Sequence, residues 1–297
     1  MSGVPCLRDL PAELDPEVYR AVHADLAGLG DDELAAHYLR YGRDEGRLAS
    51  PGQSRAWFVA HMAPHECLEI GPFDCPVLTG PRVRYFDLMD QAGLARRAAE
   101  LGRPHGRPPR IDYVSPTGDL GVVDAGRFDA VLSSHVVEHQ PDLVRHFREV
   151  ARILRPGGMY VAIIPDKRYC FDHFLRETTI ADVLDMHVAG ARTHRLKSVI
   201  EHRALTCHND SARHWAGDHG APPGCLDAVR RALAEYEEAA GGYVDVHAWQ
   251  FHPVQFRLLA EQLFTLGLSP LGPVRVYGTL RDQLEFIAVL ERPLPGR

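Results

Sequence analysis

The sequence predicts an α/β fold with a mostly parallel sheet, and residues 128–166 carry most of that prediction. Phe128–Ser134 is a short apolar run, and apolar residues recur at helical spacing across residues 143–154. Met159–Ile164 is then a continuous apolar run, typical of a strand covered on both faces. A strand, a helix and a second strand in this order form the unit from which parallel sheets are built.

Polar segments follow both of these strands. Residues 134–140 come directly after the first strand, and residues 165–169 come directly after the second. The carboxyl ends of parallel strands meet at one edge of the sheet, and open α/β sheets bind their ligands there. We therefore expect the functional site at this edge.

Further elements are expected on either side of this unit. Apolar runs predict five more strands, at residues 67–70, 83–87, 110–114, 274–278 and 284–290. Helical spacing and capping residues predict helices over residues 55–62, 91–101, 225–240 and 252–264. The predicted sheet therefore has seven strands, all of them within residues 50–297.

Residues 1–49 are predicted to form a small helical appendage. Asp15 and Pro16 are typical of the N-cap and first position of one helix, and Asp31 opens a second. Residues 50–52 read Ser-Pro-Gly and mark a linker to the α/β domain. A packing arm or an oligomer contact, with no chemistry of its own, is the role that we expect for this appendage.

Composition limits the partners that the chain can have. The chain has 297 residues and a net charge of −7, without a block of consecutive Lys or Arg, so nucleic acid is not an expected partner. The six cysteines show no C-x-x-C spacing, which is typical of reduced thiols in the cytoplasm. The sequence shows no secretory signal and no apolar run of membrane-spanning length. We expect a cytoplasmic protein, and a homo-oligomer stays open.

The block FDAVLSSHVVEH, followed by LRPGG and an apolar strand, resembles the second half of class I S-adenosylmethionine-dependent methyltransferases that modify small molecules and sugars. The resemblance implies a Rossmann-like seven-stranded sheet with helices on both faces and an antiparallel last strand. It also implies S-adenosyl-L-methionine as the cofactor. A nicotinamide-binding dehydrogenase would have a parallel last strand. The appendage is similar to a short helical module found beside bacterial glycan-processing domains, which favours a sugar acceptor.

The glycine-rich motif of the resembled family, E-x-G-x-G-x-G, is only partly present. Glu69 and Gly71 match, whereas Pro72 and the next residues do not. Eleven residues separate Gly71 from Val83, and a parallel crossover with a helix usually takes about a dozen or more. The first crossover helix is therefore expected to be cut to a turn or two. The resemblance implies cofactor contacts from Glu69, Gly71 and Pro72.

Further cofactor contacts are expected along the same edge. Asp87 ends the second strand, where an acid accepts hydrogen bonds from ribose hydroxyls, although a turn-forming Asp would look the same. The resemblance places an acidic or polar residue near the third strand to meet the adenine amino group, and Asp112 and Asp119 are both candidates. The same resemblance makes Ser134 and His135 part of the cofactor pocket.

The acceptor side is expected near the ends of the fourth and fifth strands. An oxygen or nitrogen acceptor must lose a proton, and His, with an ordinary pKa of about 6.5, suits a general base. His139 is the candidate base, and Asp166 is a candidate base or cation ligand. Arg168, Tyr169 and His173 are expected to contact the acceptor, and Arg168 would suit an anionic one such as a nucleotide sugar or a uronate.

An insertion of about residues 170–249 is rich in His and Asp. Such a composition allows a divalent cation, but no recognised zinc spacing is present, so a polar lid over the substrate is expected and no metal ligand is assigned. The expected function is O-methylation of a small molecule such as a sugar or glycan precursor. The alternative is a non-catalytic binding protein that retains a degenerate methyltransferase fold. A nucleotide-sugar oxidoreductase is a weaker alternative.

Overall fold

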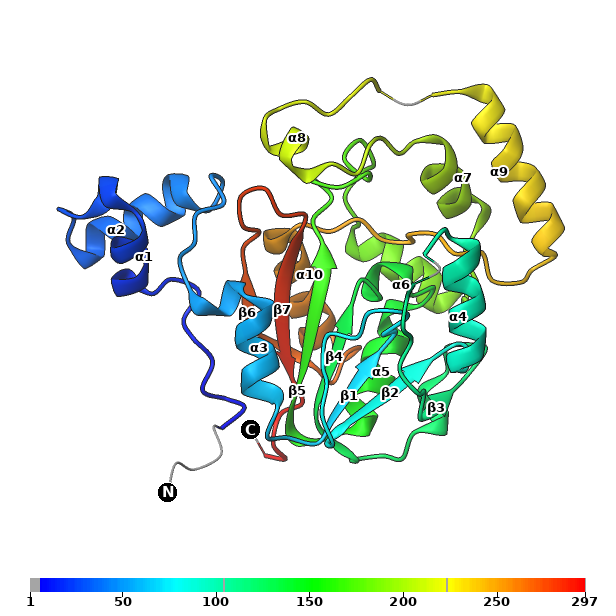
Figure 1. Ribbon diagram of the computed structural model, residues 1–297, viewed down its shortest axis with the longest axis horizontal. Helices are drawn as coiled ribbons and strands as arrows, with labels where there is room; N and C mark the ends of the chain where they lie inside the picture. Colours follow the sequence, from blue (N-terminus) through cyan, green and yellow to red (C-terminus); the bar gives the residue numbers. More distant parts are fainter. Residues whose placement is uncertain (1–5, 104, 223, 297) are drawn as a thin grey trace.

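A single seven-stranded sheet organises the computed structural model, which describes residues 6–103, 105–222 and 224–296 (Figure 1). The spatial strand order is β3-β2-β1-β4-β5-β7-β6. The strands are β1 (Cys67–Ile70), β2 (Val83–Asp87), β3 (Tyr113–Val114), β4 (Phe128–Ser134), β5 (Leu154–Pro165), β6 (Gly272–Tyr277) and β7 (Glu285–Glu291). The β3-β2-β1-β4-β5 pairs are parallel, and β7 is antiparallel to both of its neighbours. The predicted fold class is confirmed.

Two predicted strands begin three or more residues away from the observed starts, while the bounds of β6 and β7 differ by only one or two residues. The third strand was expected over residues 110–114, but β3 pairs with β2 only from Tyr113. Before that point the Asp112 carboxylate accepts the N–H of Tyr85 at 3.0 Å, so a side chain takes the place of the ladder bond. The fifth strand begins earlier than expected, at Leu154, because Leu154 already pairs with Phe128; residues 155–158, with a φ of +79° at Gly157, then interrupt the pairing until Met159 pairs with Ala130.

The short spacing predicts a first crossover helix of a turn or two, but the structure, which describes all of residues 71–82, has no helix between β1 and β2. Residues 71–82 form turns between β1 and β2. Glu69 holds this connection, because its buried carboxylate accepts the backbone N–H groups of Val77 and Leu78, each at 2.8 Å. Leu78 is thereby packed into a core that also contains Phe58 and Met62.

Helices cover both faces of the sheet. One core lies between the sheet and α5 (Leu143–Ile153), α6 (Ile180–Val188) and α10 (Pro253–Thr265). The opposite core lies between the sheet and α3 (Arg55–Met62), through Phe58 and Met62. Successive residues of a strand point to opposite faces, so Val161 and Ile163 enter one core while Ala162 and Ile164 enter the other.

Capping residues fix where several helices begin. Asp142 accepts the N–H of Arg145 at 2.9 Å and so starts α5 directly after the polar turn that follows β4. Asp90 does the same for α4 (Gln91–Glu100) through Gly93. His252 and Pro253 start α10, as predicted. The short helical turns of the domain are η3 (Pro51–Gln53), η4 (Leu120–Val122) and η5 (Val137–His139).

The amino-terminal segment has a small core of its own. It contains α1 (Pro16–Val22), η1 (Ala24–Leu26), α2 (Asp31–His37) and η2 (Tyr38–Gly42). Tyr19, Leu34 and Tyr38 are buried together there. Asp15 caps α1 by accepting the N–H groups of Glu17 and Val18, as expected from the sequence. The division at residue 49 stays a prediction.

The insertion adds helices beyond the carboxyl ends of the strands. It contains α6, α7 (Leu196–Ala204), α8 (Ser211–Trp215) and α9 (Leu226–Ala239). Figure 1 shows α7, α8 and α9 on that side of the sheet. Val199 and Ala232 join α7 to α9, together with Val244 and Val246 of the returning chain. The insertion therefore lies over the edge where a ligand is expected.

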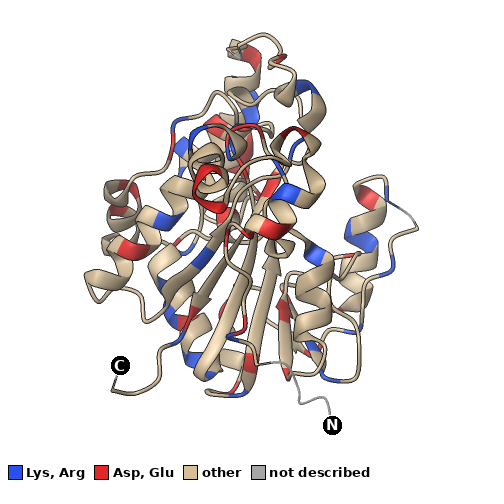
Figure 2. Ribbon diagram, turned by 90° about the vertical axis from the view of Figure 1, so that its left-hand side faces the viewer, with Lys and Arg blue, Asp and Glu red and all other residues tan. Residues whose placement is uncertain are grey.

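Lys and Arg positions and Asp and Glu positions are interspersed along the ribbon drawn in Figure 2. Within the part of the chain that the structure describes, none of the helices has the length and apolarity needed to cross a membrane.

We predict that Glu69→Gln removes a pH dependence of stability. Burial raises the pKa of Glu69 from 4.5 to about 7, so the folded state holds the proton more tightly than the unfolded state. Protonated Glu69 therefore contributes to the stability of the folded state. This contribution is complete below about pH 4.5 and is lost as the pH rises through about 7. Urea unfolding should show that, between about pH 5 and about pH 8, the free energy of unfolding of the wild type falls by roughly 2 to 3 kcal/mol more than that of the variant. Parallel pH profiles would contradict this placement of the carboxyl group.

Candidate functional site

A cavity of about 800 Å³ lies at the carboxyl ends of β1, β2 and β4. This is the point where the sheet order reverses, because β2 lies on one side of β1 and β4 on the other. Open α/β sheets bind ligands at such a switch point, and the volume falls within the usual range of about 300 to 1,000 Å³ for ligand pockets. Gly71, Asp87, His135 and His139 line this cavity, as the sequence predicts for the site.

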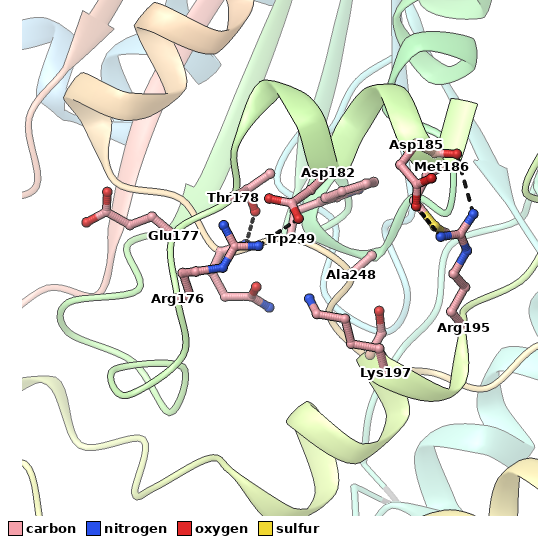
Figure 3. Close-up of a pocket in the computed structure, with 12 residues that line it drawn as sticks. Arg176, Glu177, Thr178, Asp182, Asp185, Met186, Arg195, Lys197, Ala248 and Trp249 are labelled. Atoms are coloured by element: carbon pink, nitrogen blue, oxygen red, sulfur yellow. Dashed lines mark hydrogen bonds and ion pairs between the residues drawn. The ribbon is translucent and has the colours of Figure 1, made fainter. Parts of the chain in front are cut away.

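A second hollow, in the insertion, is a poor candidate for the site (Figure 3). Its volume is only about 60 Å³. Its charged side chains are also paired among themselves, since Arg176 contacts Asp182 at 2.7 Å and Arg195 forms an ion pair with Asp185. Neither the space nor the charge is available for a cofactor.

Gly71 brings two strand ends unusually close together. Its φ is +69°, a conformation that favours glycine, and a Cβ at this position would lie 2.7 Å from Cγ2 of Val136. The next residues turn sharply, and Phe73 also has a positive φ of 47°. The loop after β1 therefore reaches the turn after β4 only because position 71 has no side chain.

Asp87 is placed with its carboxylate at the cavity wall. One oxygen accepts the N–H of Leu88 at 2.7 Å, and the other accepts the N–H of Phe73 at 3.3 Å. Burial raises the pKa of Asp87 despite these backbone hydrogen bonds. Each oxygen of a carboxylate can accept a further hydrogen bond, so Asp87 retains acceptor capacity toward a ligand hydroxyl.

The turn after β4 is held between the sheet and the insertion. His135 has a φ of +54°, and its N–H donates to the carbonyl of Ile163 on β5 at 2.9 Å. On the other side, the carbonyl of Glu138 accepts the N–H of Ala248 at 2.7 Å. Nε2 of His194 lies 2.9 Å from the carbonyl oxygen of His139. The insertion thus fixes how His135 and His139 face the cavity.

His139 has an acidic partner that sequence reasoning did not find. Its Nδ1 lies 3.1 Å from Oδ1 of Asp245, which also lines the cavity. Burial alone would lower the pKa of His139, but Asp245 and Glu138 outweigh it and raise that pKa. In turn, His139 holds the pKa of Asp245 well below its usual range. Next to them, burial lowers the pKa of His247 to about 3.

Two arginines in the cavity were also missed. Arg145, in the first turn of α5, and Arg192, in the insertion, line it together. Burial and the neighbouring Arg192 lower the pKa of Arg145. Among the described residues, neither guanidinium has a carboxylate within 4 Å. The cavity therefore contains two cationic groups that can bind an anionic part of a ligand.

Four residues predicted as cofactor contacts are not among those described as lining the cavity. Glu69 holds the first crossover instead, and Asp112 bonds to Tyr85 on the far side of β2. Pro72 and Ser134 lie beside lining residues in the sequence without lining the cavity themselves. Asp119, the other candidate for the adenine contact, does line it.

The residues predicted after β5 also lie elsewhere. Asp166 is fully buried, pairs with Arg168 at 2.7 Å and accepts a hydrogen bond from the Thr279 hydroxyl at 2.6 Å. Tyr169 stacks on Trp215, with ring centroids 3.7 Å apart. These side chains satisfy one another, and none of them is among the residues that line the cavity.

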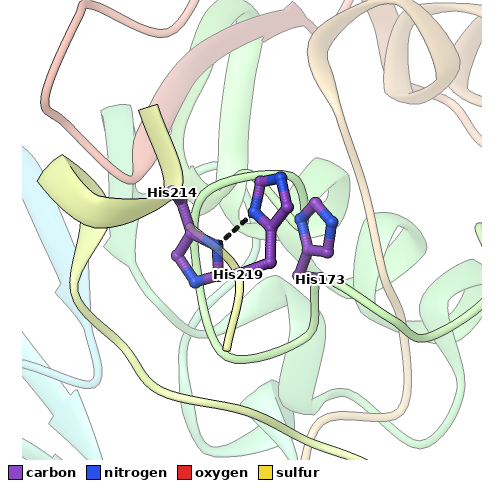
Figure 4. A group of neighbouring side chains, drawn as sticks. All are labelled: His173, His214 and His219. Atoms are coloured by element: carbon purple, nitrogen blue, oxygen red, sulfur yellow. Dashed lines mark hydrogen bonds between the residues drawn. The ribbon is translucent and has the colours of Figure 1, made fainter. Parts of the chain in front are cut away.

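His173 lies with His214 and His219 in a separate group, drawn in Figure 4. All three belong to the insertion, and none of them is among the residues that line the cavity. The structure thus gathers Gly71, Asp87, His135 and His139, but not His173, at one site.

The sheet order, with β7 antiparallel among the described strands, and the cavity at the switch point are those of the Rossmann-like methyltransferase fold. Residues 82–162, from β2 to β5, match the family model described as a methyltransferase domain. This segment of the chain is therefore similar to a methyltransferase domain.

Curated relatives match only a short segment. Ubiquinone biosynthesis O-methyltransferases from three strains of Xanthomonas oryzae pv. oryzae are 38% identical over 68 residues. That segment is 22% of this chain and 28% of each relative. Because the match spans little more than a quarter of the relatives' length, their acceptor does not carry over with it.

Solved structures resemble the chain at low identity. A Rhodobacter sphaeroides protein described as a zinc-dependent alcohol dehydrogenase is 15% identical, with 83% of this chain and 91% of that chain covered and a TM-score of 0.45. The 1,6-didemethyltoxoflavin-N1-methyltransferase of Burkholderia thailandensis, with bound S-adenosylhomocysteine, is 14% identical, with 94% and 91% covered and a TM-score of 0.38. Both TM-scores lie below 0.5, so neither likeness carries an argument.

We predict that Gly71→Ala destabilises the protein more than Gly118→Ala. Both positions have a positive φ, +69° and +70°, and an L side chain there costs about 1 to 2 kcal/mol. Only Gly71 adds the contact with Val136, since the nearest atom at Gly118 is 3.5 Å away. Overpacking of this kind costs about 1 to 3 kcal/mol.

Urea unfolding of the two variants measures the difference. Val136→Ala removes Cγ2. The double variant Gly71→Ala/Val136→Ala should therefore lose most of the extra destabilisation that Gly71→Ala shows over Gly118→Ala. Equal destabilisation by the two glycine replacements would show that the loops do not meet as described.

Proposed function

We propose that this methyltransferase transfers a methyl group from S-adenosyl-L-methionine to a hydroxyl oxygen of a small acceptor, with a sugar or nucleotide sugar as the acceptor class. The observation that carries the proposal is that one cavity combines a cofactor edge, with Gly71 and Asp87, and a polar wall containing His139. In the reaction the acceptor oxygen forms a bond to the methyl carbon, and the carbon–sulfur bond breaks with its electron pair left on sulfur.

The cofactor is proposed to lie along the loops after β1, β2 and β3. The bare backbone at Gly71 allows the methionine end to approach, and the Asp87 carboxylate accepts from the ribose hydroxyls. Asp119 takes the adenine amino contact in place of Asp112, since Asp119 lines the cavity. His135 completes the pocket at the end of β4.

The acceptor is proposed to lie against His139. The hydroxyl must lose its proton as the new bond forms, and His139 is the proposed general base that takes it. Asp245 and the buried Glu138 lie next to His139. Arg145 and Arg192 favour an acceptor with an anionic group, such as the phosphates of a nucleotide sugar or the carboxylate of a uronate. This role passes to them from Arg168, which is paired with Asp166.

A cytoplasmic setting is part of the proposal. Cys6, Cys67, Cys75, Cys170, Cys207 and Cys225 are all free. Unpaired cysteines are typical of a reducing compartment such as the cytoplasm.

Calorimetry with S-adenosyl-L-methionine and with S-adenosylhomocysteine tests the cofactor site. Asp87→Ala should weaken the binding of both by about 1.5 to 3 kcal/mol, the cost of losing a hydrogen bond to a charged group. Asp112→Asn is the matched control, because it removes a neighbouring carboxylate outside the cavity, and its affinity should equal that of the wild type. If the wild type binds neither compound, the chain is a binding protein with an eroded glycine motif rather than an enzyme.

Transfer of a radiolabelled methyl group onto a panel of sugar nucleotides tests the acceptor side. With the acceptor that this panel identifies, His139→Gln should lower kcat by roughly 10²- to 10⁴-fold while calorimetry shows unchanged cofactor affinity. His173→Gln is the control, since His173 lies in the separate group of histidines. Full activity of the His139 variant would remove His139 from the mechanism.

A further inference from the structure

Glu138 presents an electrostatic problem that the methyltransferase fold alone does not explain. Its side chain is only 1% exposed, and neither carboxylate oxygen has a hydrogen-bond donor among the described residues. Burying a carboxylate without a partner costs several kcal/mol, so such a group requires a cation or a donor nearby. Glu138 therefore marks a place where positive charge is needed.

Three imidazole nitrogens surround this carboxylate. Oε1 of Glu138 lies 3.7 Å from Nδ1 of His135, 3.9 Å from Nε2 of His139 and 4.0 Å from Nε2 of His247. These separations are too long for hydrogen bonds. The ligand atoms of Glu138, His139 and His247 lie within 4.8 Å of one another, and ligands held at about 2.0 to 2.2 Å around one tetrahedral ion lie about 3.3 to 3.6 Å apart, so binding an ion would draw these side chains inward.

The opposite nitrogen of each imidazole faces a carboxylate. Nε2 of His135 lies 2.9 Å from Glu285, and Nδ1 of His247 lies 2.6 Å from Asp172. Nδ1 of His139 lies 3.1 Å from Asp245. An ionised carboxylate only accepts, so the contacts with Glu285 and Asp172 place the ring proton of His135 on Nε2 and that of His247 on Nδ1, whereas Nδ1 of His139 has no hydrogen-bond partner among the described residues. Nδ1 of His135 and Nε2 of His247 then face Glu138 with lone pairs, and the ligand atoms of Glu138, His139 and His247 all lie within 4.8 Å of one another.

We infer that Glu138, His139 and His247, with His135 beside them, form a site for a divalent transition-metal cation in the wall of the cavity. The pattern of a carboxylate behind each ligating histidine is the usual outer shell of such sites, where it fixes the tautomer. Imidazole and carboxylate ligands together suit Zn²⁺, Mn²⁺, Fe²⁺ or Co²⁺ rather than Mg²⁺ or Ca²⁺, which prefer oxygen alone.

The position of this site gives it a role in the proposed function, on which this part of the inference rests. His135 and His139 line the cavity, so a cation held beside them can bind an acceptor hydroxyl directly. Binding to the cation lowers the pKa of that hydroxyl, and its proton leaves to water through the open cavity. His139 then acts as a ligand that positions the acceptor oxygen.

The other histidine group serves as an internal comparison. The rings of His173 and His219 stack with centroids 3.7 Å apart and planes 11° apart, so their in-plane lone pairs run side by side and do not converge (Figure 4). Nδ1 of His214 and Nδ1 of His219 are 3.0 Å apart and bond directly to each other. This group is satisfied without a cation.

Metal titration of the full chain, after chelator treatment and dialysis, tests the inference. Co²⁺ should bind with one equivalent and give the visible absorption of a low-symmetry site, and Zn²⁺ should displace it. Glu138→Gln should weaken Co²⁺ binding at least 100-fold, and Asp172→Asn, which removes a carboxylate behind His247, should weaken it roughly 10- to 100-fold. His219→Gln is the matched control and should bind as the wild type does.

Cofactor calorimetry on the same samples separates this inference from the proposed function. Glu138→Gln that still binds S-adenosylhomocysteine is folded, so its loss of Co²⁺ binding supports the site. Saturation of the wild type with cofactor but no Co²⁺ binding at micromolar concentrations would overturn the cation site and leave the methyltransferase proposal standing. Equal Co²⁺ affinity in wild type and Glu138→Gln, or loss of binding in His219→Gln, would overturn it as well.

Discussion

The contact between Gly71 and Val136 determines where this protein can bind a ligand. The loop after β1 reaches the turn after β4 because no side chain intervenes, and the cavity opens between them at the switch point of the sheet. The turn itself is fixed from two sides, by β5 through the N–H of His135 and by the insertion through the carbonyl of Glu138. The cofactor edge and the polar wall are therefore held in one rigid arrangement.

The fold was predictable because its signals are local. Apolar runs, capping residues such as Asp15 and Asp142, and the short spacing after Gly71 each act within a few residues. The prediction was wrong where a side chain replaced the backbone, as Asp112 does beside Tyr85. A hydrogen bond from a side chain in place of a backbone hydrogen bond between strands does not alter the pattern of apolar residues. The start of β3 could therefore not be placed from the sequence.

The site was only partly predictable, for a different reason. Gly71, Asp87, His135 and His139 were found because each lies at the end of a strand or within a few residues after it. Residues after β5 follow a strand equally, yet Asp166 is neutralised by Arg168, and that pairing turns both away from any ligand. Strand ends show which edge a residue lies on, but only the packed structure shows whether its charge is already satisfied.

The acidic and basic groups of the polar wall come mostly from the insertion. Arg192, Asp245 and His247 lie over a hundred residues from β1 in the sequence, and no motif joins them to the turn that holds Glu138. Their positions depend on the backbone hydrogen bond from the N–H of Ala248 to the carbonyl of Glu138. The insertion, which composition presents only as a polar lid, supplies much of the chemistry that we propose.

The most direct test of the account is a crystal structure of the chain grown with S-adenosylhomocysteine. The account predicts density for the compound in the cavity, with its ribose hydroxyls on the carboxylate of Asp87 and its sulfur directed toward the wall that holds His139. A fully occupied ligand elsewhere on the molecule, or side chains filling the space between Gly71 and Asp87 at saturating concentration, would contradict it.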